Sequence, residues 1–205
     1  MSATRAQRSD ATRAALLHAA THAICELGMH GASIDLIAAR AGYTKGAFYA
    51  HFASKEELFL TLLDEHFAAE LDRLDAVLTG AEEPVREARL AAEGFLAQID
   101  ADPQWRRLYL ELANHAARNE AFRTQFAARE RALRTRMASV FERWAADLGL
   151  IPAVPARDVA AMAVFMADGF LLNRTIDPAL EDALYGTMFE VFLRGLLAMT
   201  GADPA

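Results

Sequence analysis

The chain has 205 residues, 54% of them hydrophobic, with a formal net charge of −7 at pH 7. That length and composition allow one large or two small globular domains with a substantial core. A single cysteine, Cys25, excludes an intramolecular disulfide, and the longest apolar stretch, Val159 to Ala167, is about half the roughly 20 residues of a membrane-spanning helix. With no signal peptide either, we expect a soluble, cytoplasmic protein.

The spacing of apolar residues and the positions of capping residues predict helices throughout the chain and no strands. Asp10 can cap the first helix, and Gly28 can end it. The inward stripe of this helix contains Leu17, Ala20, Ile24 and Leu27.

Two short helices follow, separated by a tight turn. Ser33 can cap a helix at about 33–41, and Thr44 can cap a second at about 45–51. Gly42 between them supplies the left-handed backbone that a sharp turn needs. This is the pattern of a helix-turn-helix, which predicts DNA as the target.

Capping residues and prolines mark the remaining helices. The capping box Ser54-x-x-Glu57 opens a long helix from 55 to about 78, while Pro84 and Pro103 stand where proline starts a helix. The last five helices are predicted at about 84–100, 103–116, 119–148, 156–174 and 180–199. Asp102 is the predicted cap of the second of these, and Thr79-Gly80 and the residues after Thr200 are predicted to lie outside helices. The predicted fold is all-α, with about nine helices.

The charges of the helix-turn-helix segment favour an anionic partner. Lys45 and Lys55 each lie at the first position of a predicted helix, where a cation opposes the helix dipole and a phosphate would compensate. Gly46 costs the short second helix about 1 kcal/mol relative to alanine, which is understandable if the backbone must come close to a partner. Residues 1 to 55 hold six basic and three acidic residues, a balance of +3, whereas the remainder of the chain has a balance of −10. The basic N-terminal part therefore suits nucleic acid despite the acidic total.

The run GYTKGAFYAHF from Gly42 to Phe52, followed by SKEELF from Ser54 to Phe59, resembles the N-terminal signature of the TetR/AcrR family of bacterial transcriptional regulators. The resemblance covers about residues 10–63; beyond it, only length and helix layout agree. It implies a homodimeric repressor, released from a palindromic operator by a small, largely apolar effector. The implied organisation is a flexible arm at 1–9, a helix-turn-helix DNA-binding domain at 10–54 and a ligand-binding and dimerisation domain at 55–205.

Within the predicted DNA-binding domain, Tyr43 and Lys45 are best placed for base edges, a lysine for guanine and an aromatic ring for a thymine methyl group. Phe48 and Phe52 are predicted core residues. Gly46 is predicted to allow close approach of the backbone. The predicted backbone-positioning residues are Ser33, Thr44, Tyr49, His51 and Lys55.

Two further sets of residues are predicted in the C-terminal domain. An effector pocket is predicted from large, adaptable side chains with a polar group among them: Phe95, Trp105, Leu108, Tyr109, Leu112, His115, Phe122, Phe141, Met162, Phe165 and Met166. A dimer interface of four helices, two from each subunit, is predicted from the unusually apolar last two helices: Phe170, Tyr185, Phe189, Phe192, Leu193 and Leu196. The alternative for either set is an ordinary intramolecular core.

Two other function classes stay open at this point. An enzyme would need a nucleophile with its base, a metal-binding set or a phosphate-binding loop, and no such spacing is present, so neither a cofactor, a metal site nor catalytic residues are predicted. A ligand-independent DNA-binding or architectural protein would have the same N-terminal domain. A response to effector would separate it from a ligand-controlled regulator.

Overall fold

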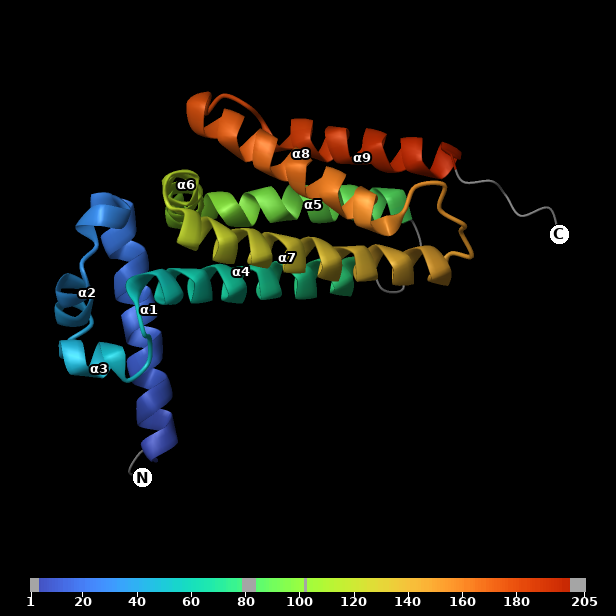
Figure 1. Ribbon diagram of the computed structural model, residues 1–205. Coiled ribbons are helices and arrows are strands. Elements are labelled where there is room, and N and C mark those ends of the chain that lie inside the picture. The colour runs from blue at the N-terminus through green and yellow to red at the C-terminus, as the bar shows by residue number, and fades with distance from the viewer. Residues whose placement is uncertain (1–3, 79–83, 102, 200–205) are drawn as a thin grey trace. The chain divides into compact units, whose positions relative to one another are not determined.

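The computed structural model describes residues 4–78, 84–101 and 103–199, and in these ranges every regular element is a helix (Figure 1). The predicted all-α class and the number of helices are confirmed. The helices are α1 (Arg5–Gly31), α2 (Ile34–Arg40), α3 (Lys45–Tyr49), α4 (Lys55–Leu78), α5 (Pro84–Ala101), α6 (Pro103–Arg118), α7 (Glu120–Asp147), α8 (Ala156–Ile176) and α9 (Asp182–Met199).

The first helix begins six residues earlier than predicted. Thr4 rather than Asp10 is its N-cap, because the Thr4 hydroxyl accepts the Gln7 N–H at 3.2 Å and the Gln7 side chain accepts the Thr4 N–H at 2.8 Å. Part of the predicted flexible arm is thus helical. Gly28 breaks α1 as predicted, with φ 68° and ψ 176°, although one further turn continues to Gly31. The predicted cap Asp102, Thr79-Gly80 and Thr200 lie outside the described residues.

The chain forms two compact units. Unit 1 contains Met1–His66 and Asp102–Ala128, and unit 2 contains Phe67–Ala101 and Arg129–Ala205. Both α4 and α7 therefore contribute to each unit. These units are defined by packing, so the functional boundary predicted between residues 54 and 55 stays a prediction.

Unit 1 is built around α1, which packs against both α2 and α6. Leu17, Ala20 and Ile24 of α1 are at most 5% exposed, as the predicted stripe requires. Leu27, predicted in the same stripe, is instead 48% exposed, next to the break at Gly28. The Arg13 guanidinium lies 5.7 Å from the centre of the Phe52 ring and 2.7 Å from a Glu65 carboxylate oxygen, which ties the start of α1 to the segment before α4 and to α4 itself.

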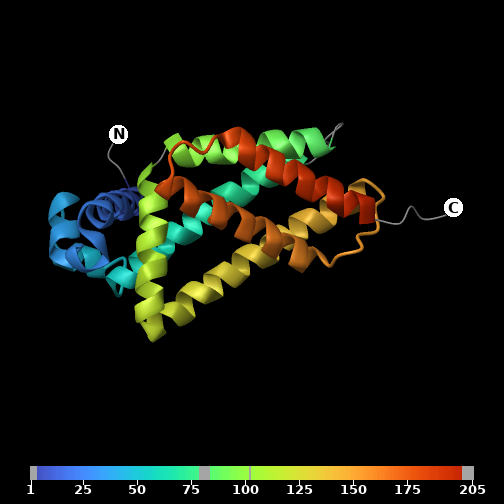
Figure 2. The same ribbon diagram turned by 90° about the horizontal axis from the view of Figure 1, so that it is seen from above.

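Unit 2 is built mainly on the packing of α5 against α9, whose ribbons cross in the view of Figure 2. Its core brings together Ala88 of α5, Trp144 of α7, Ala163 of α8 and Phe189 of α9. By length and composition alone α8 could cross a membrane. However, it buries one side in this core, as a core helix does.

Candidate DNA-binding site

The α2–turn–α3 segment is fixed by local hydrogen bonds that the sequence predicted. The Ser33 hydroxyl accepts the Leu36 N–H at 3.2 Å, and the Thr44 hydroxyl accepts the Ala47 N–H at 3.2 Å, so each short helix has its N-cap. Gly42 has φ 77°. The following N–H, that of Tyr43, donates back to the Ala38 carbonyl at 2.9 Å and closes the turn.

One side of this segment is buried and holds α3 in place. Phe48 and Phe52 are at most 3% exposed, as predicted, and Ile37 of α2 and Leu58 of α4 are fully buried as well. The Phe48 and Phe52 rings lie 5.7 Å apart. Burying a side chain of this size contributes about 1.5–3 kcal/mol, so the packing orients a helix of only five residues that has little stability of its own.

The predicted DNA-contacting residues lie on the other side, where most of them are exposed to solvent. Ser33, Tyr43, Thr44, Lys45 and Tyr49 are all exposed, and His51 is half-buried. The Tyr49 ring is 51% exposed although its edge contacts Phe48, with the ring centres 5.6 Å apart. A short helix with a buried aromatic anchor and an exposed face of aromatic, hydroxyl and basic groups has the form of a groove-reading element.

Gly46 has no reason within the chain to be glycine. A Cβ added there would meet only the Thr44 hydroxyl oxygen, at 3.7 Å, which is an ordinary contact. Its φ is not in the left-handed region that favours glycine. Neither packing nor backbone geometry therefore explains the residue. Close approach of an external surface to α3 would explain it.

Lys45 is paired across the turn with Asp35 of α2. Its Nζ lies 3.0 Å from an Asp35 carboxylate oxygen, and both side chains are exposed. The hydrogen bond to Asp35, followed by its charge, raises the pKa of Lys45, so the lysine is cationic at neutral pH. Lys45 can leave Asp35 for another partner at little cost, because an exposed ion pair contributes at most about 1 kcal/mol.

Lys55 has a partner that the sequence did not predict. Its Nζ donates to the Met29 carbonyl at 2.7 Å, and the side chain is half-buried. The Met29 N–H donates in turn to a Glu111 carboxylate oxygen at 3.3 Å. Lysine has three donors, so a phosphate contact by Lys55 stays a prediction, but the residue also joins α4 to the end of α1.

The helix α4 begins on a modified capping box. The Ser54 hydroxyl accepts the Glu57 N–H at 3.1 Å, as predicted. The Glu57 carboxylate accepts the N–H of Ala53 at 2.6 Å, one residue before the cap. The start of α4 is therefore tied to the loop that follows α3.

The residues predicted for the effector pocket are divided between the two units. In unit 1, Trp105 stacks on His66 with ring centres 3.5 Å apart, and Tyr109 lies 6.0 Å from Phe126. Others in unit 1 are Leu108, Leu112, His115 and Phe122, while unit 2 holds Phe141, Met162, Phe165 and Met166. The Phe95 side chain lies outside the described residues. Leu108, Leu112, Phe122 and Phe141 are core residues within their units, and Met162 and Phe165 are exposed.

His115 is the polar member of that set with the most unusual surroundings. Burial lowers the pKa of His115, and the ring lies edge-on to Phe122 with ring centres 4.8 Å apart. Its Nε2 atom is buried and has no hydrogen-bond partner among the described residues. A buried polar atom that has no partner in the chain is suited to form a hydrogen bond with a ligand.

Most residues predicted for the dimer interface pack inside unit 2, so the interface stays a prediction. Phe170, Tyr185, Phe189 and Leu193 are at most 6% exposed within unit 2, and Phe192 and Leu196 are half-buried against the same core. Of the six, Phe192 and Leu196 keep part of their side chains accessible to a second chain. The burial of Tyr185 also raises the pKa of its hydroxyl.

The exposed apolar residues of α8 and α9 lie on other faces of these helices, and we call them the α8–α9 stripe: Met162, Phe165, Leu172, Ile176, Leu184, Val191 and Met199. On α8 the spacing 162, 165, 169, 172, 176 describes one helical face, with the exposed Gly169 at its centre. That spacing was present in the sequence. Only packing shows which of two apolar faces is free.

Comparisons with known proteins agree with the fold and identify the family. The family model for bacterial regulatory proteins of the TetR family matches residues 16–62, and that for the C-terminal domain of BetI-type transcriptional repressors matches residues 84–198. A relative from Mycolicibacterium smegmatis, the HTH-type transcriptional activator FasR, is 36% identical over 102 residues. That match covers 50% of this chain and 47% of the relative, so the chain spans about half the length of that relative.

Solved structures with the same fold cover nearly the whole chain. A protein assigned to the TetR family from Mesorhizobium loti superposes with a TM-score of 0.75 and 22% identity, over 98% of this chain and all of that one. The complex of SmeT with triclosan gives a TM-score of 0.71 and 26% identity, over 95% and 93% of the two chains. SmeT is the repressor of the Stenotrophomonas maltophilia multidrug efflux pump SmeDEF. With both halves matched by its models, the chain belongs to the TetR family of DNA-binding transcriptional regulators.

Proposed function

We propose that this regulator is a cytoplasmic homodimeric repressor that binds a palindromic operator and is released from it by a small, largely apolar effector. The observation that carries the proposal is the division of α2 and α3 into a fully buried aromatic side and an exposed side bearing Tyr43, Lys45 and Tyr49. A rigid backbone with an exposed, basic and aromatic face is what groove reading requires.

The contacts follow from the exposed side. Lys45 and Tyr43 reach base edges at the N-terminal end of α3, where recognition helices make most base contacts. The exposed hydroxyls of Ser33 and Thr44, with Tyr49, His51 and Lys55, contact the sugar–phosphate backbone and fix the register. Gly46 lets the α3 backbone approach the groove.

The α8–α9 stripe supports dimerisation. A helix of five residues reads only a few base pairs, and two such helices about 34–36 Å apart read a palindrome across one helical turn of DNA. Phe165, Leu172 and Val191 are between 47% and 65% exposed, an unusual display of large apolar side chains on adjacent helices. A two-fold interface would cover them.

Lys45→Ala is expected to weaken binding to an operator, selected from a random duplex pool, by about 1–3 kcal/mol and to change binding to random DNA less, because a base contact is lost. Asp35→Asn is the matched variant: it frees Lys45 from its ion pair and removes a negative charge. It should strengthen binding to both DNAs and make log K fall more steeply with log salt, by about one unit. Fluorescence anisotropy titrations at two salt concentrations measure both effects.

The two DNAs give the contrast that decides the role of Lys45. Equal losses on operator and random DNA would make Lys45 a phosphate contact rather than a base contact. If neither Lys45→Ala nor Asp35→Asn changes binding to either DNA, the exposed side of α3 is not the DNA-binding surface.

The effector half of the proposal rests on the aromatic groups around α6. The Tyr109 ring centre lies 6.4 Å from that of Trp105 and 6.0 Å from that of Phe126. The His115 Nε2 atom is buried without a partner among the described residues. The structure of SmeT with triclosan makes a compact apolar aromatic molecule a sensible first probe. An effector should raise the melting temperature and lower operator affinity, typically by a coupling of about 1–3 kcal/mol.

Tyr109→Ala should abolish both effects of such an effector while leaving ligand-free operator affinity within a few fold. Leu90→Ala, which truncates an exposed residue of α5, is the control and should respond normally. A Tyr109→Ala protein that still releases DNA at the same effector concentration would place the effector elsewhere. If no member of a varied apolar panel acts on the wild type, a ligand-independent DNA-binding protein becomes the better description.

One observation favours the opposite sign of regulation. The relative from Mycolicibacterium smegmatis is named a transcriptional activator. A reporter gene placed behind the selected operator distinguishes the two: a repressor lowers its expression and an effector restores it, whereas an activator raises it.

A further inference from the structure

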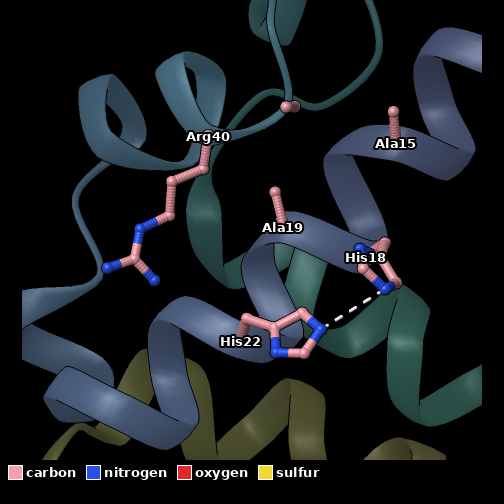
Figure 3. Close-up of a pocket in the computed structure, with 6 residues that line it drawn as sticks. Ala15, His18, Ala19, His22 and Arg40 are labelled. Atoms are coloured by element: carbon pink, nitrogen blue, oxygen red, sulfur yellow. Dashed lines mark hydrogen bonds between the residues drawn. The ribbon is translucent and has the colours of Figure 1, made fainter.

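Two histidines on α1 face each other one helical turn apart, outside the residues assigned to DNA, effector or dimer contacts. His18 and His22 lie at positions i and i+4, and their Nε2 atoms are 3.3 Å apart (Figure 3). The pair lines a solvent-open pocket of about 380 Å³ together with Ala15 and Ala19 of α1 and the end of α2 at Arg40 and Ala41.

The distance between the two nitrogens suits a shared metal ion as well as a hydrogen bond. A zinc–imidazole bond is about 2.0–2.1 Å long, and two such bonds at a tetrahedral angle place their nitrogens about 3.3 Å apart. Histidines at i and i+4 on a helix present their rings on one face, as in the zinc-binding helix of metalloproteases. The rings of His18 and His22 therefore need little movement to ligate one ion.

The other nitrogen of His22 already has a partner. Its Nδ1 lies 3.0 Å from the side-chain nitrogen of Gln104 in α6. With that amide in the reverse orientation, its oxygen would accept a hydrogen bond from the Nδ1–H group. Metal-binding histidines characteristically use their second nitrogen in this way, which fixes the ring and the tautomer. Gln104 is thus placed to orient His22 toward the pocket.

The basic residue at the pocket is neutralised. The Arg40 guanidinium lies 2.8 Å from a Glu26 carboxylate oxygen, and in Figure 3 its side chain extends apart from the two imidazoles. A free arginine beside two histidines would favour an anion. Because Arg40 is paired with Glu26, the imidazole nitrogens are the main groups in the pocket that can bind a ligand.

We propose that His18 and His22 form a two-histidine site for a divalent late transition-metal ion, with Gln104 as the residue that positions His22. Imidazole ligands suit Cu²⁺, Ni²⁺ and Zn²⁺, and the affinity should follow Mn²⁺ < Co²⁺ < Ni²⁺ < Cu²⁺. The remaining coordination positions face the pocket and take water or a small ligand. The ion links two turns of α1 and so stabilises unit 1.

The test uses the full chain without a polyhistidine tag and titrates CuCl₂, NiCl₂ and ZnCl₂ by calorimetry, with Cu²⁺ electron paramagnetic resonance as a second readout. One equivalent of Cu²⁺ should bind with nitrogen hyperfine structure and raise the melting temperature. His18→Ala and His22→Ala should each lower the affinity at least tenfold. Gln104→Leu should lower it about tenfold, as removal of an outer partner does.

His30→Ala is the matched control, because His30 is the next histidine of α1 and is exposed. Its Cu²⁺ affinity should stay within twofold of the wild type, and circular dichroism should show all four variants folded. Unchanged binding in both His18→Ala and His22→Ala would overturn the site. So would equal affinity for Mn²⁺ and Cu²⁺, or a calorimetric response to inorganic phosphate that His18→Ala removes.

Discussion

Val191→Glu is expected to convert the protein into folded monomers, whereas Phe189→Glu, two residues earlier on α9, is expected to unfold unit 2. Val191 is 65% exposed and belongs to the α8–α9 stripe, so a glutamate there keeps its hydration in a single chain. At a two-fold interface the same carboxylate would be buried next to its own copy, which is strongly unfavourable. Phe189 is 6% exposed in the core, where an unpaired carboxylate costs several kcal/mol beyond the lost aromatic packing.

Sedimentation velocity and circular dichroism together separate the two outcomes. Leu90→Glu on α5 is the control, because Leu90 is 47% exposed and lies outside the stripe, and this variant should stay dimeric and folded. A dimeric Val191→Glu protein would show that the interface does not include this face. A folded, monomeric Phe189→Glu protein would restore the interface that the sequence alone suggested.

Phe48→Ala is expected to lower the free energy of unfolding by about 3–5 kcal/mol and to abolish operator binding. Phe48 is fully buried, and its ring contacts those of Tyr49 and Phe52, with ring centres 5.6 and 5.7 Å away. Because α3 has only five residues, its orientation depends on this one anchor. Losing the anchor releases the recognition helix even where α1 and α4 remain folded.

Tyr49→Ala, the next residue along α3, is the matched variant. Tyr49 is 51% exposed, so its removal should change stability by no more than about 0.5 kcal/mol while weakening DNA binding through a lost contact. Thermal unfolding and operator titration measure the two quantities separately. If Phe48→Ala binds operator as the wild type does, then α3 is held by something other than its aromatic side.

Helix starts were predictable because a cap is a local device. The Ser33 hydroxyl binds the N–H of Leu36, and the Thr44 hydroxyl binds that of Ala47. Each partner is only three residues along the chain, so the cap can be recognised from a short stretch of sequence. The start of α1 was placed wrongly because two valid caps compete: Asp10 was assigned, while the reciprocal pair of Thr4 and Gln7 wins by satisfying a second N–H.

The contacts that could not be predicted from the sequence join residues that are far apart in the chain. Lys55 reaches a carbonyl 26 residues away, and Glu111 an N–H 82 residues away, and no local pattern records either contact. The inner and outer faces of α9 could not be told apart from the sequence for a related reason. Both Phe189 and Val191 suit an apolar helix face, and only the packing of α9 against α5 decides that the first is inside and the second outside.

The hydrogen bonds around Met29 also restrict how this protein can evolve. The Met29 N–H is held by Glu111 and its carbonyl by Lys55, while the preceding Gly28 has φ 68° and would place a Cβ 3.2 Å from a Glu111 carboxylate oxygen. A side chain at position 28 would need both a left-handed backbone and a shorter acid at 111. We therefore expect positions 28, 55 and 111 to change together. A substitution at one of them alone would be disfavoured by the residues at the other two.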